Sequence, residues 1–136
     1  GALDIEASAT HQHVRYVGRR FGHANHYEEA EMLQYEGSGP AIGSATTYVR
    51  GGRINQLLDQ MAGGIDLQSC QTMLRDHANY PGSICRHEDA GRCGYYTRAA
   101  LLYAPAQGRM LLTDGPACQN PFTEHRIELT AMPRPA

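Results

Sequence analysis

The densest group of polar side chains lies between Phe21 and Tyr27 and contains two histidines. His23 and His26 are three residues apart, which in a strand would point them to opposite faces, and no acidic residue or cysteine follows at a spacing familiar from zinc sites. A hydrogen-bonding role around a turn is the simpler interpretation for either histidine. We therefore expect no metal at this pair.

Asn25 lies between these histidines, at the expected end of a strand. A fixed side-chain amide can donate a hydrogen bond to the oxyanion that forms when an amide or ester carbonyl is attacked, and losing one such donor costs about 2.7–4 kcal/mol of transition-state stabilisation. An asparagine beside a turn is also commonly structural. Taken alone, Asn25 is a candidate and no more.

A second cluster of polar residues lies at the expected end of the second helix and in the turn after it. Asp76 and His77 with Ser83 or Cys85 contain the residue types of a nucleophilic triad, but sequence neighbours at a helix end rarely converge on one nucleophile. A polar turn that caps the helix and packs Cys85 into the core is the favoured interpretation.

The same region also offers sulfur and nitrogen ligands for zinc. Cys85, His87, Cys93 and Cys118 have suitable side chains, but the short paired Cys-x-x-Cys spacing typical of zinc domains is missing. This alternative is kept open beside the others.

Arg50 and Arg53 lie at the start of an expected helix. The planar fork of one of them could hold a carboxylate or steady a catalytic pair near Asn25. The plainer alternative is a solvated first turn.

Two helices must position these groups. The first is expected from Thr46 to Ala62, stopped by Gly63 and Gly64, and the second begins at Asp66, a favourable N-cap. Each carries an apolar face: Ile54, Leu57, Leu58 and Met61 in the first, and Leu67, Cys70, Met73 and Leu74 in the second. Together they predict an αα-hairpin.

Strands are expected on both sides of the helices. Tyr95 to Tyr103 and Arg109 to Asp114 flank the turn sequence Ala-Pro-Ala-Gln-Gly and predict a β-hairpin. Further strands are expected at Thr123 to Thr130, Ala2 to Glu6 and Val14 to Val17. The order predicts an α+β protein with helices against an antiparallel sheet, forming a single segment over residues 1–136. An exposed sheet edge would favour a missing partner segment.

Composition excludes several classes of function. The 136 residues are 41% hydrophobic and 19% charged, as in a globular protein, and the net charge is −2. All twelve basic residues are arginines and they are scattered, so nucleic acid is not an expected partner. No apolar run approaches the roughly 20 residues of a membrane span, and neither a secretion signal nor a disulfide framework is evident. A cytoplasmic protein is expected.

Several stretches, in this order, resemble the isopenicillin N acyltransferase-like branch of the N-terminal-nucleophile hydrolases. They are Asp4-Ile5-Glu6-Ala7, His23-Ala24-Asn25-His26-Tyr27, the helix start at Arg50, Leu74-Arg75-Asp76-His77, Pro81-Gly82-Ser83-Ile84-Cys85-Arg86-His87 and Gly115-Pro116-Ala117-Cys118. The resemblance implies the C-terminal part of a four-layer αββα fold, in a self-processing amide hydrolase or acyltransferase.

The resemblance also implies roles for single residues. Asn25 matches the asparagine of the oxyanion hole. Arg50 matches an arginine near the nucleophile, although the family's usual serine three residues earlier is Thr47 here and Arg53 competes for the role. His23, His26, Asp76 and His77 match structural motif positions. No metal or cofactor is implied.

In this family a processed N-terminal cysteine attacks the acyl carbonyl, with its own α-amine as base. The chain has no cysteine before Cys70, so the nucleophile is expected on a separate or missing N-terminal part of the same precursor. A second cleavage, a nick or a truncation would each explain this, and with the N-terminal chain the protein would form a heterodimer that is active only when complete. The alternatives are a non-catalytic module of the same fold that binds a ligand or partner, and the small zinc domain above. The acyl and amine groups, and the choice between hydrolysis and transfer, are not determined.

Overall fold

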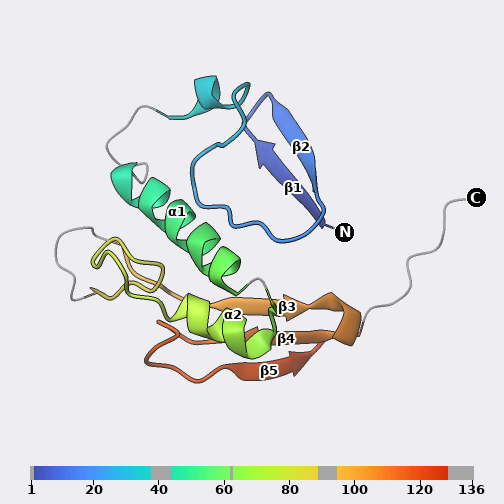
Figure 1. Cartoon of the computed structure of the whole chain (residues 1–136), viewed down its shortest axis with the longest axis vertical. Coiled ribbons are helices and arrows are strands. Elements are labelled where there is room, and N and C mark those ends of the chain that lie inside the picture. Colours follow the sequence, from blue (N-terminus) through green and yellow to red (C-terminus); the bar gives the residue numbers. More distant parts are fainter. Residues whose placement is uncertain (1, 38–43, 62, 89–94, 129–136) are drawn as a thin grey trace, which may run out of the picture.

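A computed structural model describes residues 2–37, 44–61, 63–88 and 95–128. It is a small α+β domain with two antiparallel sheets and two α-helices (Figure 1). No helix in these four ranges is both long and apolar enough to cross a bilayer.

The first sheet has two strands, β1 (Ala2–Ala7) and β2 (Gln12–Val17), paired from Ala2 opposite Val17 to Ala7 opposite Gln12. Both strands were expected from the sequence. Ser8 closes the turn because its backbone N–H and its hydroxyl both donate to the carbonyl of His11.

This sheet has its charged face turned inward. Glu6 is 2% exposed, whereas Leu3, Ile5, Val14 and Tyr16 are 61%, 57%, 49% and 69% exposed. Because strand side chains alternate between faces, these four residues form one apolar face that no described residue covers. We call these four residues the apolar face of β1 and β2.

The helices begin and end close to the expected positions. Helix α1 (Ser44–Gln60) precedes Gly63 and Gly64, and Ala62, its expected last residue, lies outside the described ranges. Helix α2 (Leu67–Leu74) is capped by Asp66, which exchanges hydrogen bonds with Ser69 in a capping box. The chain then turns back, so that Asp76 meets Arg53 in the middle of α1.

The second sheet is a meander of β3 (Leu101–Ala104), β4 (Arg109–Leu112) and β5 (Thr123–Arg126). The short 3-10 helix η3 (Pro105–Gln107) and Gly108 form the hairpin turn, and Gly108 has a positive φ of 59° that favours glycine. The strands are shorter than expected, because residues 95–100 are irregular and 129–130 lie outside the described ranges. Helix α2 packs against β3 (Figure 1).

Among the residues that the structure describes, few apolar side chains are buried. They are Met32, Leu57, Met73, Cys85, Ala100, Leu111 and Ala117. Polar residues are also buried among them. Hydrogen bonds between the loops and the regular elements therefore help to hold the interior together.

Candidate functional site

Asn25 and Arg50 lie together. Arg50 in α1 donates from Nη2 to Oδ1 of Asn25 at 2.8 Å, and the backbone N–H of Asn25 donates to the hydroxyl of Thr47 at 2.8 Å. Both contacts tie the loop after β2 to the first turns of α1. The loop begins beyond the end of β2 at Val17, so the expectation that Asn25 ends a strand was wrong.

The contact fixes the orientation of the Asn25 amide. A guanidinium group only donates hydrogen bonds, so the atom facing Arg50 must be the carbonyl oxygen. The Asn25 Nδ2 group, with its two protons, is thereby directed away from Arg50. It has the polarity that an oxyanion requires.

Arg53 does not compete for this place. Its guanidinium donates from Nε and Nη2 to both carboxylate oxygens of Asp76, at distances of 2.6–3.1 Å. These hydrogen bonds lower the pKa of Asp76. Arg50 is therefore the arginine that contacts the candidate oxyanion donor.

A pocket of about 650 Å³ opens beside this pair. Asn25 and Arg50 line it together with Arg86. Apolar and aromatic side chains from the end of α2 and the approach to β3 form much of the remaining wall: Leu74, Ile84, Tyr95, Tyr96, Ala99 and Leu101. Polar side chains are interspersed with these apolar ones, and such a combination can orient a small molecule.

The two arginines make the pocket suited to an anion. Burial and the nearby charge of Arg86 lower the pKa of Arg50. The Nε atoms of Arg50 and Arg86 are buried and have no hydrogen-bond partner among the described residues. A ligand carboxylate would offset the repulsion between the guanidinium groups.

His23 and His26 have structural partners. The His23 ring faces an acceptor at each nitrogen, because Nδ1 lies 2.9 Å from Oδ1 of Asp4 and Nε2 lies 2.9 Å from the carbonyl oxygen of His26. Burial opposes protonation, but these two hydrogen bonds outweigh it and raise the pKa of His23. A doubly protonated ring has no lone pair for a metal. His26 is buried, with Nδ1 3.0 Å from the Thr47 hydroxyl.

The triad considered for Asp76 and His77 does not form. The Asp76 carboxylate accepts from Arg53 and from the backbone N–H of Ala78, so it supports the turn after α2 and does not orient His77. Ser83 donates its hydroxyl hydrogen to the carbonyl of Cys85.

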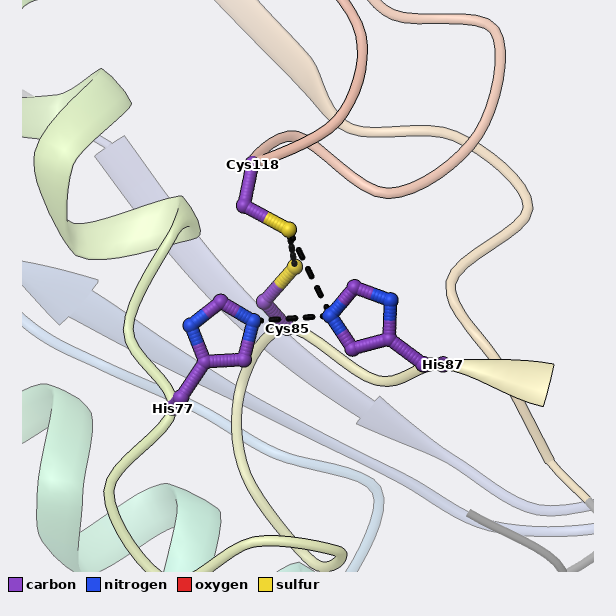
Figure 2. Close-up of side chains that lie close together, drawn as sticks. All are labelled: His77, Cys85, His87 and Cys118. Atoms are coloured by element: carbon purple, nitrogen blue, oxygen red, sulfur yellow. Dashed lines mark hydrogen bonds between the residues drawn. The ribbon is translucent and has the colours of Figure 1, made fainter. Parts of the chain in front are cut away.

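His77 lies in a different environment, beside His87, Cys85 and Cys118 (Figure 2). Partial removal of water from around its sulfur and the neighbouring Cys85 thiol raise the pKa of Cys118. Sequence reasoning missed His77 as a member of this cluster, and Cys93, which it included, lies outside the described residues. It also assigned no role to Arg86 in the pocket.

No protein-family model matches the chain, and no curated protein sequence matches it. The family resemblance therefore stays a prediction that rests on the motifs.

Proposed function

We propose that this chain is the C-terminal part of an N-terminal-nucleophile amide hydrolase or acyltransferase, and that a cysteine outside residues 1–136 completes its active site. The observation that carries the proposal is the hydrogen bond from Arg50 to Oδ1 of Asn25 at the wall of the pocket. The two residues singled out by the resemblance lie 25 positions apart, yet they meet at one potential substrate site.

The chemistry requires a hydrogen-bond donor to the oxyanion, and this is the role that we propose for Asn25. The cysteine thiol passes its proton to its own α-amine and attacks the acyl carbonyl, forming a C–S bond and an oxyanion. The Asn25 amide stabilises this oxyanion by hydrogen bonding. The C–N bond then breaks, the departing amine takes the proton, and the thioester passes its acyl group to water or to another amine.

The pocket also suggests the class of substrate. Arg50 and Arg86 both line the pocket, and each carries a guanidinium group. We infer an acyl or amine substrate that carries a carboxylate. The apolar and aromatic wall would hold its hydrocarbon part.

The exposed apolar face of β1 and β2 supports the proposal that a partner segment covers it. Its four large side chains are each about half exposed or more, which is unusual for one side of a two-stranded sheet. In the proposed four-layer fold, further strands and a second sheet from the nucleophile-bearing part of the same precursor would cover this face.

The test begins with the full precursor, whose mature polypeptides are identified by intact mass and N-terminal sequencing. Hydrolysis of a panel of N-acyl amino acids is then compared between wild type, Asn25→Ala and Gln60→Ala. Gln60 is an exposed amide at the end of α1 that does not line the pocket, so it serves as the matched control.

We expect a chain with an N-terminal cysteine, and a kcat lowered about 10²–10³-fold by Asn25→Ala and unchanged by Gln60→Ala. Equal activity of Asn25→Ala and wild type would reject the oxyanion role. Absence of any chain with a processed cysteine would reject the enzyme and favour a non-catalytic module that binds an anionic acyl ligand.

A further inference from the structure

Four side chains with metal-binding atoms converge on one point outside the pocket. His77 follows α2, Cys85 and His87 belong to the next turn, and Cys118 lies in the loop between β4 and β5 (Figure 2). One ligand atom of each residue lies within 4.8 Å of all the others. Two sulfurs and two imidazole nitrogens are a common ligand set of structural zinc sites.

The distances between these atoms approach the edges of a zinc tetrahedron. With Zn–S bonds of about 2.3 Å and Zn–N bonds of about 2.0–2.1 Å, the edges are about 3.8 Å for S–S, 3.5 Å for S–N and 3.3 Å for N–N. The corresponding distances are 3.6 Å from Cys85 Sγ to Cys118 Sγ, 3.4 Å from Cys118 Sγ to His87 Nε2, and 2.8 Å between the histidine Nε2 atoms. These are three of the six edges, and the other three pairs of ligand atoms lie within 4.8 Å. Binding of the ion would require the two histidine rings to move apart.

The two histidines oppose each other in an arrangement that a cation would stabilise. Their Nε2 atoms face each other, with ring centroids 5.0 Å apart and planes inclined by 12°. In this pair only one ring can donate, and protonation of both would place two like charges in contact. A metal ion between the rings would use both lone pairs.

The backbone of the ligands is held in place by neighbouring hydrogen bonds. The N–H of Cys85 donates to the carbonyl of Asp76 at 3.0 Å, and Nε of Arg75 donates to the carbonyl of Ala117 at 3.0 Å. Both cysteine-bearing loops are thus fixed to consecutive residues at the end of α2. Such support is typical of preorganised metal sites.

The second group with possible ligands lacks these features. Asp4, Glu6 and His23 also lie close together. However, Asp4 pairs with Arg15 and His23, and Glu6 accepts two backbone N–H groups. Its charges and hydrogen bonds are already satisfied by protein groups.

We propose that His77, Cys85, His87 and Cys118 bind one Zn²⁺ ion in a closed, structural site. All four positions are filled by protein atoms, so the ion has no open position for substrate. It ties the β4–β5 loop to the turn after α2, from which Ile84 and Arg86 reach the pocket. This site does not depend on the proposed acyl-transfer function.

The test uses the complete protein, purified without a polyhistidine tag, without chelator and with its thiols reduced. Elemental analysis measures zinc per chain in wild type, Cys118→Ser and His77→Ala, and Co²⁺ substitution reports thiolate ligation by its absorption spectrum. Cys118 and His77 are the exposed ligands, so their loss disturbs the fold less than loss of the fully buried Cys85. The matched controls are Cys70→Ser and His125→Ala, which lie outside the cluster.

We expect about one zinc per chain in wild type and both controls, with tetrahedral thiolate-bound Co²⁺ after exchange. Loss of a group that only hydrogen-bonds to a metal ligand weakens metal binding roughly 10–100-fold. Loss of a ligand itself, in either variant, should weaken zinc binding by more than this. A chain that takes up neither zinc nor Co²⁺ would overturn the proposal, as would zinc content unaffected by both ligand variants. A Cys85–Cys118 disulfide as the stable state of the purified protein, seen as a loss of two hydrogens in intact mass, would also overturn it.

Discussion

Replacing Glu6 by glutamine tests whether a buried carboxylate holds the loop that carries Asn25. Glu6 is 2% exposed, and its two oxygens accept separate backbone hydrogen bonds from Glu28 at 2.6 Å and from Glu29 at 3.2 Å. Glutamine has nearly the same shape but offers only one acceptor oxygen. Its NH₂ group would face a backbone donor.

The magnitude follows from these two bonds. One hydrogen bond to a charged acceptor is lost, at about 1.5–3 kcal/mol, and the other becomes a neutral bond that is about 1 kcal/mol weaker. Glu6→Gln should therefore destabilise the protein by about 2.5–4 kcal/mol. With a urea m-value of about 1–3 kcal/mol/M, the unfolding midpoint should fall by about 1–4 M.

The assay is urea unfolding followed by circular dichroism, with Glu128→Gln as the matched control because Glu128 is exposed. The control should have the wild-type midpoint. If both variants unfolded at the wild-type midpoint, the Glu6 carboxylate would not support the loop, and the reasoning would be refuted.

Two further predictions concern packing and pH. A Cβ at Gly22 would lie 2.4 Å from Cγ2 of Ile54, whereas one at Gly52 would meet no atom within 4 Å. Gly22→Ala should lower the free energy of unfolding by about 1–3 kcal/mol, and Gly52→Ala should stabilise α1 by up to about 1 kcal/mol. Thermal unfolding measures both, and equal melting temperatures of the two variants would contradict this prediction. Although burial opposes both shifts, the hydrogen bond between His23 and Asp4 lowers the pKa of Asp4 below 3.8 and raises that of His23 above 6.5. The stability that the Asp4 carboxylate contributes should thus be lost as pH falls below about 3.8, and the stability that His23 contributes should be lost as pH rises above about 6.5. An unfolding midpoint that does not change from pH 6 to 8 would contradict a charged His23.

Local sequence signals predicted the elements well. Strands were expected at Ala2 to Glu6 and Val14 to Val17, where β1 and β2 lie. The Asp66 cap gave the start of α2, and the turn residues gave the β3–β4 hairpin. The expectation was less accurate at residues 95–100, where apolar composition indicated a strand but the chain lies in an irregular segment at the pocket. Composition alone does not distinguish a strand from a pocket wall.

The sequence by itself determined which residue types were available and which short-range structures they form, because capping, turns and alternation act over a few residues. It could not choose between Arg50 and Arg53, since positions three apart lie on the same side of a helix. That choice was made by Asn25 and Asp76, which lie 25 and 23 residues away from them. Likewise, only the paths of the loops bring Cys118 to Cys85 across 33 residues. Tertiary structure decided these contacts because sequence spacing constrains geometry only within an element.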